Sequence, residues 1–364
     1  MSSTSSKIIR TIAILVIIFV IIGLGIWYVA EYGFKGISFS MTGRHTIQTL
    51  AGPFEEKARY EADPDDIEEI QVNWITSAVD FKIHDKDTIL FVESCQRDLS
   101  EGENLTYTIK DGVLKITELE DETIIRIAPK KVVIWIPRTL LETLSALKSN
   151  CALASVTAEE ITADTIYLES DTGRINVKNL IANQTLTLDT DTGSITASEI
   201  KAKNIVINSD TGNIDISNAQ ADVKIDVETD TGRIDIYDVT TETLICDSDT
   251  GRVTCINYIV DSITQSSDTG AVETKGTFKT GDFRSNTGSI TMKCATLPDK
   301  IYAKSDTGFI YLYTVKTEDL VVAYSTATGK FHSDFPVLVS SSGDANITMK
   351  TATGSIYIRP YEID

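Results

Sequence analysis

The triplet Asp-Thr-Gly recurs along this chain of 364 residues, and its carboxylate could do acid–base chemistry. Asp171-Thr172-Gly173 is the first of seven identical copies, and three near copies keep the final Thr-Gly. Asp-Thr-Gly is also the active-site triplet of aspartic proteases, in which two facing aspartates share one proton. That chemistry requires one pair of triplets in a hydrophobic context and a substrate cleft. Many copies in a row, each preceded by a hydroxyl residue, instead indicate a structural repeat.

The glycines of the triplets are spaced at an almost constant interval. Successive glycines are 18 to 21 residues apart through nine copies, and a last copy, Thr353-Gly354, follows after 25. The nine are Gly173, Gly193, Gly212, Gly232, Gly251, Gly270, Gly288, Gly308 and Gly329. A fixed period of this length is typical of a solenoid.

Apolar residues alternate with polar ones on both sides of each glycine. Ile166 and Leu168 precede Gly173, and Ile175 and Val177 follow it, with equivalents in the later copies. This alternation indicates strands with one buried face, and its phase changes at the triplet. The triplet is therefore predicted to be a corner, where glycine permits the bend. The predicted fold is all-β, a parallel β-solenoid (three-sided β-helix) with about 20 residues per coil. Each coil is predicted to consist of three strands of four to six residues and three corners.

The predicted corner assigns a structural role to each residue of the triplet. Ser and Thr three residues before each glycine should bond one another and the backbone along the rod axis, and the aspartates should accept backbone N–H groups. The Thr before each glycine should point inward or lie at the corner. The structural corner residues are Ser170, Thr172, Gly173, Thr192, Gly193, Thr211, Gly212, Thr231, Gly232, Thr250, Gly251, Thr269 and Gly270.

The aspartates of the triplets form a row that could bind cations. Like charges about 5 Å apart repel one another unless they are screened or neutralised, and calcium favours clustered carboxylates. Arg174, Arg233 and Arg252 could neutralise the row instead. Apart from this candidate Ca²⁺ ladder, no cofactor is expected. Its residues are Asp171, Asp191, Asp210, Asp230 and Asp249, with Asp189 and Asp247 two residues before two of them.

Three aromatic residues late in the repeats are candidates for binding. Ile310 and Leu312 should point inward, so Phe309, Tyr311 and Tyr313 should point outward. Outward aromatic rings in a row can stack on sugar rings or dock a partner. The alternative is that they pack under the C-terminal tail.

Residues 11–30 form an uncharged apolar run, which is long enough to span a bilayer as a helix. Lys7 and Arg10 precede the run, and Trp27 and Tyr28 lie at its far end, as expected for a cytoplasmic flank and an interface anchor. A cleaved signal peptide is the alternative. The prediction is a single-pass protein of the cell membrane, with a cytoplasmic N-terminus and an extracytoplasmic solenoid.

The chain divides into six predicted regions. They are a cytoplasmic N-terminus (1–10), a transmembrane helix (11–30), a linker or stalk (31–66), irregular first coils with a cap (67–150), regular repeats (151–358) and a C-terminal tail (359–364). The net charge of −20 argues against a nucleic-acid partner, because phosphate contacts need clustered Lys and Arg. No catalytic constellation is evident, so no enzyme activity is expected.

The charged N-terminus, the single span, the segment IQVNWITSAVDFKIHDKDTI and the SDTGxIxI repeats resemble the bacterial putative-adhesin family of membrane-anchored β-strand-repeat envelope proteins. The resemblance implies a non-catalytic, adhesin-like binding or scaffolding surface, or one associated with envelope stress. Its partner would be an envelope protein or a glycan. Two alternatives stay open: a polysaccharide-active or polysaccharide-binding β-helix protein, and a cation-stabilised structural rod.

Overall fold

The structure is a computed structural model, and it describes residues 46–48, 50, 52–119, 126–317, 320–340 and 345–362. The predicted cytoplasmic N-terminus and the transmembrane helix (11–30) lie outside these residues. Within the described ranges, no helix is long and apolar enough to span a membrane. The helical element found there is a short 3₁₀ helix, η1 (Arg138–Glu142).

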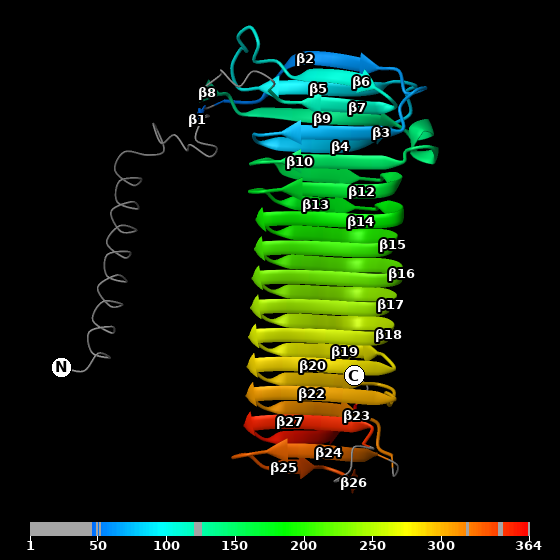
Figure 1. The fold of residues 1–364 in the computed structure, drawn as a ribbon, viewed down its shortest axis with the longest axis vertical. Helices are drawn as coiled ribbons and strands as arrows, with labels where there is room; N and C mark the ends of the chain where they lie inside the picture. Colours follow the sequence, from blue (N-terminus) through cyan, green and yellow to red (C-terminus); the bar gives the residue numbers. More distant parts are fainter. Residues whose placement is uncertain are drawn as a thin grey trace, which may run out of the picture.

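The described chain forms a rod of stacked coils (Figure 1). Equivalent residues of successive coils pair in parallel, as in the series Ile195, Ile214, Ile234 and Val253. This arrangement confirms the parallel β-solenoid with about 20 residues per coil. The strands of its regular part are β12 (Thr162–Ser170), β13 (Ile175–Lys178), β14 (Ile181–Thr192), β15 (Ile195–Thr211), β16 (Ile214–Thr231), β17 (Ile234–Thr250) and β18 (Val253–Thr269).

The long strands of the central coils differ from the short strands that the sequence predicts. Strands of four to six residues were expected, but β15 to β18 have 17 or 18 residues. The reason is that parallel pairing continues around most corners, so the ladder is interrupted only at local register shifts such as the one between Gln220 and Lys224.

Each regular coil has three inward-facing runs separated by three corners. In the coil after Gly212, the runs are carried by Ile214 and Ile216, then Ala219 and Ala221, then Ile225 and Val227, all of them buried. The corner after the first run is a residue with a left-handed backbone, and in the described coils up to Asn257 it lies six residues after the corner position. The column consists of Glu160, Asn179, Glu199, Asn218, Asp238 and Asn257, with φ between 53° and 61°. Most of these are Asn or Asp, which tolerate this conformation better than other non-glycine residues.

The C-terminal coils are not stacked in the order of the sequence. β27 (Ile347–Thr353) and β28 (Ile356–Pro360) pair on one side with β22 (Lys300–Thr307) and β23 (Ile310–Thr314). On the other side they pair with β24 (Val321–Thr326) and β25 (Phe331–Ser333). The last coil in the sequence is therefore inserted between two earlier coils, and Figure 1 shows β27 between β22 and β24. The other strands of this region are β19 (Val272–Thr277), β20 (Thr280–Thr287), β21 (Ile290–Cys294) and β26 (Leu338–Val339).

The N-terminal end has a similar interleaved order and an antiparallel cap. β3 (Glu69–Trp74) and β4 (Ala78–His84) lie between the coil of β10 (Ala146–Cys151) and β11 (Ser155–Glu159) and the coil of β7 (Val113–Thr117) and β9 (Lys130–Pro137). β5 (Ile89–Cys95) pairs antiparallel with both β9 and β2 (Glu55–Ala62), and β6 (Thr106–Lys110) forms a hairpin with β7. A short pair, β1 (Thr46–Ile47) and β8 (Arg126–Ile127), lies beside them. β2 belongs to the segment that the sequence analysis assigns to the linker (31–66).

Candidate functional site

A ladder of buried hydroxyl groups runs along the glycine corners. Ser248 donates its hydroxyl to the carbonyl oxygen of Gly232, one coil earlier, at 2.9 Å. The sequence analysis expects the hydroxyls to bond one another as well, but these bonds all go to the backbone of the neighbouring coil. The same bond, at 2.7 to 3.1 Å, is made by Ser170, Thr190, Ser209, Thr229, Ser267, Ser285, Ser305, Thr326 and Thr351.

Close contact between coils explains why the corner residue is glycine. A Cβ atom placed on Gly232 would stand 1.9 Å from the carbonyl oxygen of Gly212 and 2.6 Å from its carbonyl carbon. The backbone of Gly232 is not in the left-handed region, so its φ angle does not require glycine. The sequence analysis attributes the glycine to the bend, whereas the structure attributes it to the approach of stacked backbones.

The threonine and aspartate of the predicted corner lie on the outside. The side chains of Thr172, Thr192, Thr211, Thr231, Thr250 and Thr269 are exposed, as are those of Asp171, Asp191, Asp210, Asp230 and Asp249. In the described coils, no backbone N–H donates to these aspartates, so the predicted Asx-turn is not formed there. The carboxylates are therefore free to interact with solvent, with one another or with a ligand.

Mutual repulsion is detectable within the acidic row. Burial, followed by the charges of Asp191 and Glu169, raises the pKa of Asp171. Burial, followed by the charges of Glu169, Asp191 and Asp210, raises the pKa of Asp189. Asp189 pairs with Glu169 on the adjacent strand. Arg233, expected to neutralise the row, forms ion pairs with Asp215 and Asp235 instead. The row is thus a set of like charges that are not offset by this arginine.

The predicted cation ladder does not form a compact metal site. In the part of the chain that the structure describes, no three His, Cys, Asp or Glu side chains are gathered closely enough to hold a metal ion. Asp189 and Asp247 lie two residues before the exposed aspartates of their coils, and Asp247 accepts a hydrogen bond from Ser266 at 2.7 Å. Calcium binding along the row stays a prediction.

The aromatic residues predicted from the sequence become part of a larger stack. Because β28 is inserted beside β23, Tyr357 lies on Tyr311, with ring centroids 5.1 Å apart and planes 11° apart. His332 from β25 stacks on the other face of Tyr357 at 5.1 Å and 10°. We call Tyr311, Tyr357 and His332 the aromatic column. Phe309 is 43% exposed and lies 6.1 Å from Tyr311, at the edge of the column.

A row of basic residues runs beside the aromatic column. Lys275, Lys293, Tyr313 and Arg359 occupy equivalent positions on four successive strands of one face. The guanidinium of Arg359 lies 5.4 Å from the ring centre of Tyr357 and 5.7 Å from that of Tyr311. Stacking on aromatic faces holds an arginine in place while its N–H groups stay available. We call Lys275, Lys293 and Arg359 the basic row.

Two members of the basic row have no anionic partner among the residues that the structure describes. Lys293 forms an ion pair with Glu273 at 3.0 Å. Neither Arg359 nor Lys275 has a carboxylate within ion-pair distance among the described residues. Both line a cavity of about 360 Å³, together with Tyr313, Tyr361, Asp334 and Glu362. This cavity therefore offers cationic donors, carboxylate acceptors and aromatic faces side by side.

Charge is distributed unevenly along the rod. Residues 151–270 contain 21 acidic and 7 basic residues, a net charge of −14, whereas residues 271–364 contain ten of each. The aromatic column and the basic row lie in the second segment. The strong negative charge of the chain is thus concentrated away from the candidate site.

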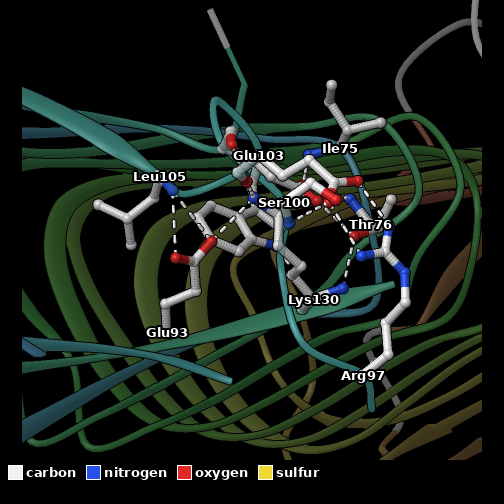
Figure 2. Close-up of polar contacts among 10 residues, drawn as sticks. Ile75, Thr76, Glu93, Arg97, Ser100, Glu103, Leu105 and Lys130 are labelled. Carbon is white, nitrogen blue, oxygen red and sulfur yellow. Dashed lines mark hydrogen bonds and ion pairs between the residues drawn. The ribbon is translucent and has the colours of Figure 1, made fainter. Parts of the chain in front are cut away.

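A second polar cluster is buried in the N-terminal cap (Figure 2). The ammonium group of Lys130 lies 2.8 Å from a carboxylate oxygen of Glu93 and donates to the backbone carbonyls of Glu103 and Glu118 at 2.7 and 2.8 Å. Lys130, Glu93 and Glu118 are almost completely buried, and Lys130 lies 5.5 Å from the ring centre of Trp74. Every donor of this ammonium therefore has a partner, as a buried charge requires.

The carboxylates of the cap cluster have opposite pKa shifts. Glu118 accepts hydrogen bonds from the backbone N–H groups of Ile75 and Thr76 and from the Thr76 hydroxyl, yet burial raises its pKa to about 7. The bidentate hydrogen bonds of Arg97 lower the pKa of Glu103 to about 2. The sequence analysis misses this cluster, because the partners of each charge come from distant segments. All of its bonds lie within the cap, which indicates a structural role.

Comparison with known proteins finds a matching family model and solved structures of low sequence identity. A family model described as Toastrack DUF4097 matches residues 67–359. A crystal structure of a putative adhesin from Parabacteroides distasonis is 14% identical, covers 71% of this chain and 96% of its own, and has a TM-score of 0.43. A crystal structure of a putative adhesin from Bacteroides fragilis is also 14% identical. It covers 83% of this chain and 96% of its own, and it has a TM-score of 0.29. Among curated proteins, none matches the chain.

Proposed function

The chain belongs to the Toastrack DUF4097 family, and on this premise we propose that it is a non-catalytic, adhesin-like surface protein that binds carbohydrate through the aromatic column. The solenoid serves as a rigid support that holds the binding face at one end of the rod. Residues 11–30 anchor the chain in the cell membrane, so that the solenoid projects outside the cytoplasm.

The observation that carries this proposal is the stack of Tyr311, Tyr357 and His332 on an outer face of the rod. The neighbouring rings cover both faces of Tyr357, so a sugar chain would lie along the outer edges of the column and contact the exposed rings of His332 and Phe309. The rings are presented from three neighbouring strands, so the rigid ladder fixes their spacing at about 5 Å.

The triplets support a non-catalytic role, since their residues are used for packing. Ser170 and Gly173 hold coils together, and Asp171 lies in an outward row with Asp191 instead of facing it across a cleft. The dyad of an aspartic protease shares one proton between two opposed carboxylates. The arrangement in this rod gives no basis for that reaction.

Binding of the full-length chain to an array of polysaccharides tests the proposal. Tyr311→Ala/Tyr357→Ala should reduce the affinity for bound glycans at least tenfold, because two of the three rings of the column are lost. Tyr107→Ala is the matched control, since Tyr107 is 39% exposed on β6, in the cap at the opposite end of the rod. Equal glycan affinity of the wild type and the double variant would contradict the proposal, provided that both melt at the same temperature.

A second function is favoured by the acidic row. The pKa of Asp189 is raised by burial and by neighbouring carboxylates, and cations that screen the row would relieve this repulsion. Under this second proposal the rod is a structural element stabilised by calcium along Asp171, Asp191 and their equivalents. Calcium-dependent melting of the chain tests it directly.

A further inference from the structure

We propose that the carbohydrate bound at the aromatic column is acidic, a polymer of sugars that carry carboxylates, and that Arg359 and Lys275 bind those carboxylates. This inference rests on the proposed function and specifies its ligand. It follows from the charge state and partners of the residues around the column.

The guanidinium of Arg359 is positioned to bind an anion. Tyrosines 311, 313 and 357 all lie within 6.0 Å of its guanidinium, measured to their ring centres. An arginine whose hydrogen-bond donors lack an anionic partner is well suited to bind a carboxylate with two parallel bonds. A sugar chain lying along the outer edges of Tyr311 and Tyr357 would place its carboxylates within reach of this guanidinium.

Lys275 extends the cationic site along the rod. It lies three strands from Arg359 in the basic row, which at about 4.8 Å per strand gives a separation of about 14 Å. Two cations without an anionic partner among the described residues, at this separation on one line, favour a polymer with repeated negative charges over a single sugar acid. Asp334 and Glu362 line the same cavity and can accept hydrogen bonds from sugar hydroxyl groups.

The charge of the remaining rod restricts such a polymer to this end. The net charge of −14 over residues 151–270 repels an anionic chain, whereas residues 271–364 are neutral overall. An acidic glycan would therefore avoid the acidic row of Asp171 and Asp191. The negative charge of residues 151–270 and the cationic groups of Arg359 and Lys275 therefore both favour binding of an acidic glycan at the C-terminal end of the rod.

The test compares probes that separate charge from ring stacking. The full-length chain is titrated with oligogalacturonate, with the same oligosaccharide fully methyl-esterified, and with inorganic polyphosphate. We expect the acid form to bind at least tenfold more tightly than the ester. Arg359→Gln should remove most of this difference while changing the affinity for the ester less than threefold, and Lys275→Gln should have a smaller effect.

Arg284→Gln is the matched control, because Arg284 is paired with Asp282 at 2.8 Å and lies on another face. Arg359→Lys keeps the charge but loses the bidentate geometry, so an intermediate affinity is expected. Equal affinities of the wild type for the acid and the ester would overturn the acidic ligand and leave carbohydrate binding intact. Polyphosphate binding as tight as that of oligogalacturonate would also overturn the inference. If neither sugar probe binds, the proposed function fails together with it.

Discussion

Ser248 donates its hydroxyl to the carbonyl oxygen of Gly232, a residue one coil earlier, at 2.9 Å. Gly232 in turn packs so closely on Gly212 that a Cβ atom on Gly232 would stand 1.9 Å from the carbonyl oxygen of Gly212. The hydroxyl and the glycine therefore form one unit, in which the absent side chain allows the backbones to approach. The repeated Ser-Asp-Thr-Gly pattern is explained by this contact.

Replacing Gly232 with alanine should destabilise the rod strongly. The new Cβ would overlap a backbone oxygen, which cannot move without breaking the parallel ladder, so a loss of about 3 kcal/mol or more in the free energy of unfolding is expected. Urea denaturation measures it. Thr231→Ala is the control next to it, and with an exposed side chain it should change stability by less than about 0.5 kcal/mol. Similar losses in the two variants would contradict this account.

Removing a hydroxyl of the ladder should cost less than filling a glycine corner. Ser248→Ala deletes the hydrogen bond to Gly232 and leaves a buried carbonyl with one partner fewer, for an expected loss of about 1 to 2 kcal/mol. The same denaturation measurement applies. A stability equal to that of the wild type would show that the ladder does not hold the coils together.

Glu118 should give the protein a stability that falls with rising pH. Its pKa is about 7 in the folded chain, above the ordinary value of 4.5, so between these pH values the folded state binds more protons than the unfolded state. The free energy of unfolding should therefore decrease from pH 4.5 to pH 7, by about 3 kcal/mol from this residue. Glu118→Gln should remove that decrease. Glu103 affects stability in a separate pH range. Because its pKa is lowered to about 2 in the folded chain, its contribution to the free energy of unfolding is lost as the pH falls from 4.5 to 2.

The buried pair of Lys130 and Glu93 should depend on both partners. Lys130→Met leaves the carboxylate of Glu93 buried without its cation, and a loss of about 3 to 5 kcal/mol is expected. The double variant Lys130→Met/Glu93→Gln should recover part of that loss, because no uncompensated charge remains. Thermal unfolding of the two variants measures the difference. A double variant less stable than Lys130→Met would count against the pairing.

Calcium dependence distinguishes the second proposed function. If cations stabilise the acidic row, calcium should raise the melting temperature of the wild type above its value in a chelator. Asp189→Asn should reduce that shift, because it removes one of the mutually repelling carboxylates. Identical melting curves in calcium and in chelator would rule out the cation-stabilised rod.

The sequence predicts the coil but not the order of the coils. Ile310, Ile356 and Phe331 occupy the same column relative to their glycines, so each of these coils presents almost the same apolar side chains to its neighbours. Nothing in that pattern indicates that Ile356 stacks directly on Ile310. For this reason Phe309, Tyr311 and Tyr313 can be recognised from alternation alone, while their contacts with Tyr357 and Arg359 require the insertion of β28.

The cap illustrates a different limit of sequence reasoning. The hairpin at Asp111-Gly112 is evident from the turn residues, which have φ angles of 51° and 79°. The burial of Lys130 cannot be predicted from the residues next to it in the sequence. Its partners Glu93 and Glu103 come from a strand and a loop elsewhere in the cap. Charged residues are usually exposed, so a buried one is recognised only from its tertiary contacts.

The most direct test of the account is to identify what touches the aromatic column in living cells. A photo-crosslinking phenylalanine analogue replaces Phe309, which is 43% exposed at the edge of the column, and a second chain carries it at Tyr107 in the cap as the control. We predict that the adduct at position 309 contains acidic sugars and that the one at 107 does not. Equal sugar capture at both positions, or adducts at position 309 that contain protein and no sugar, would contradict the claim.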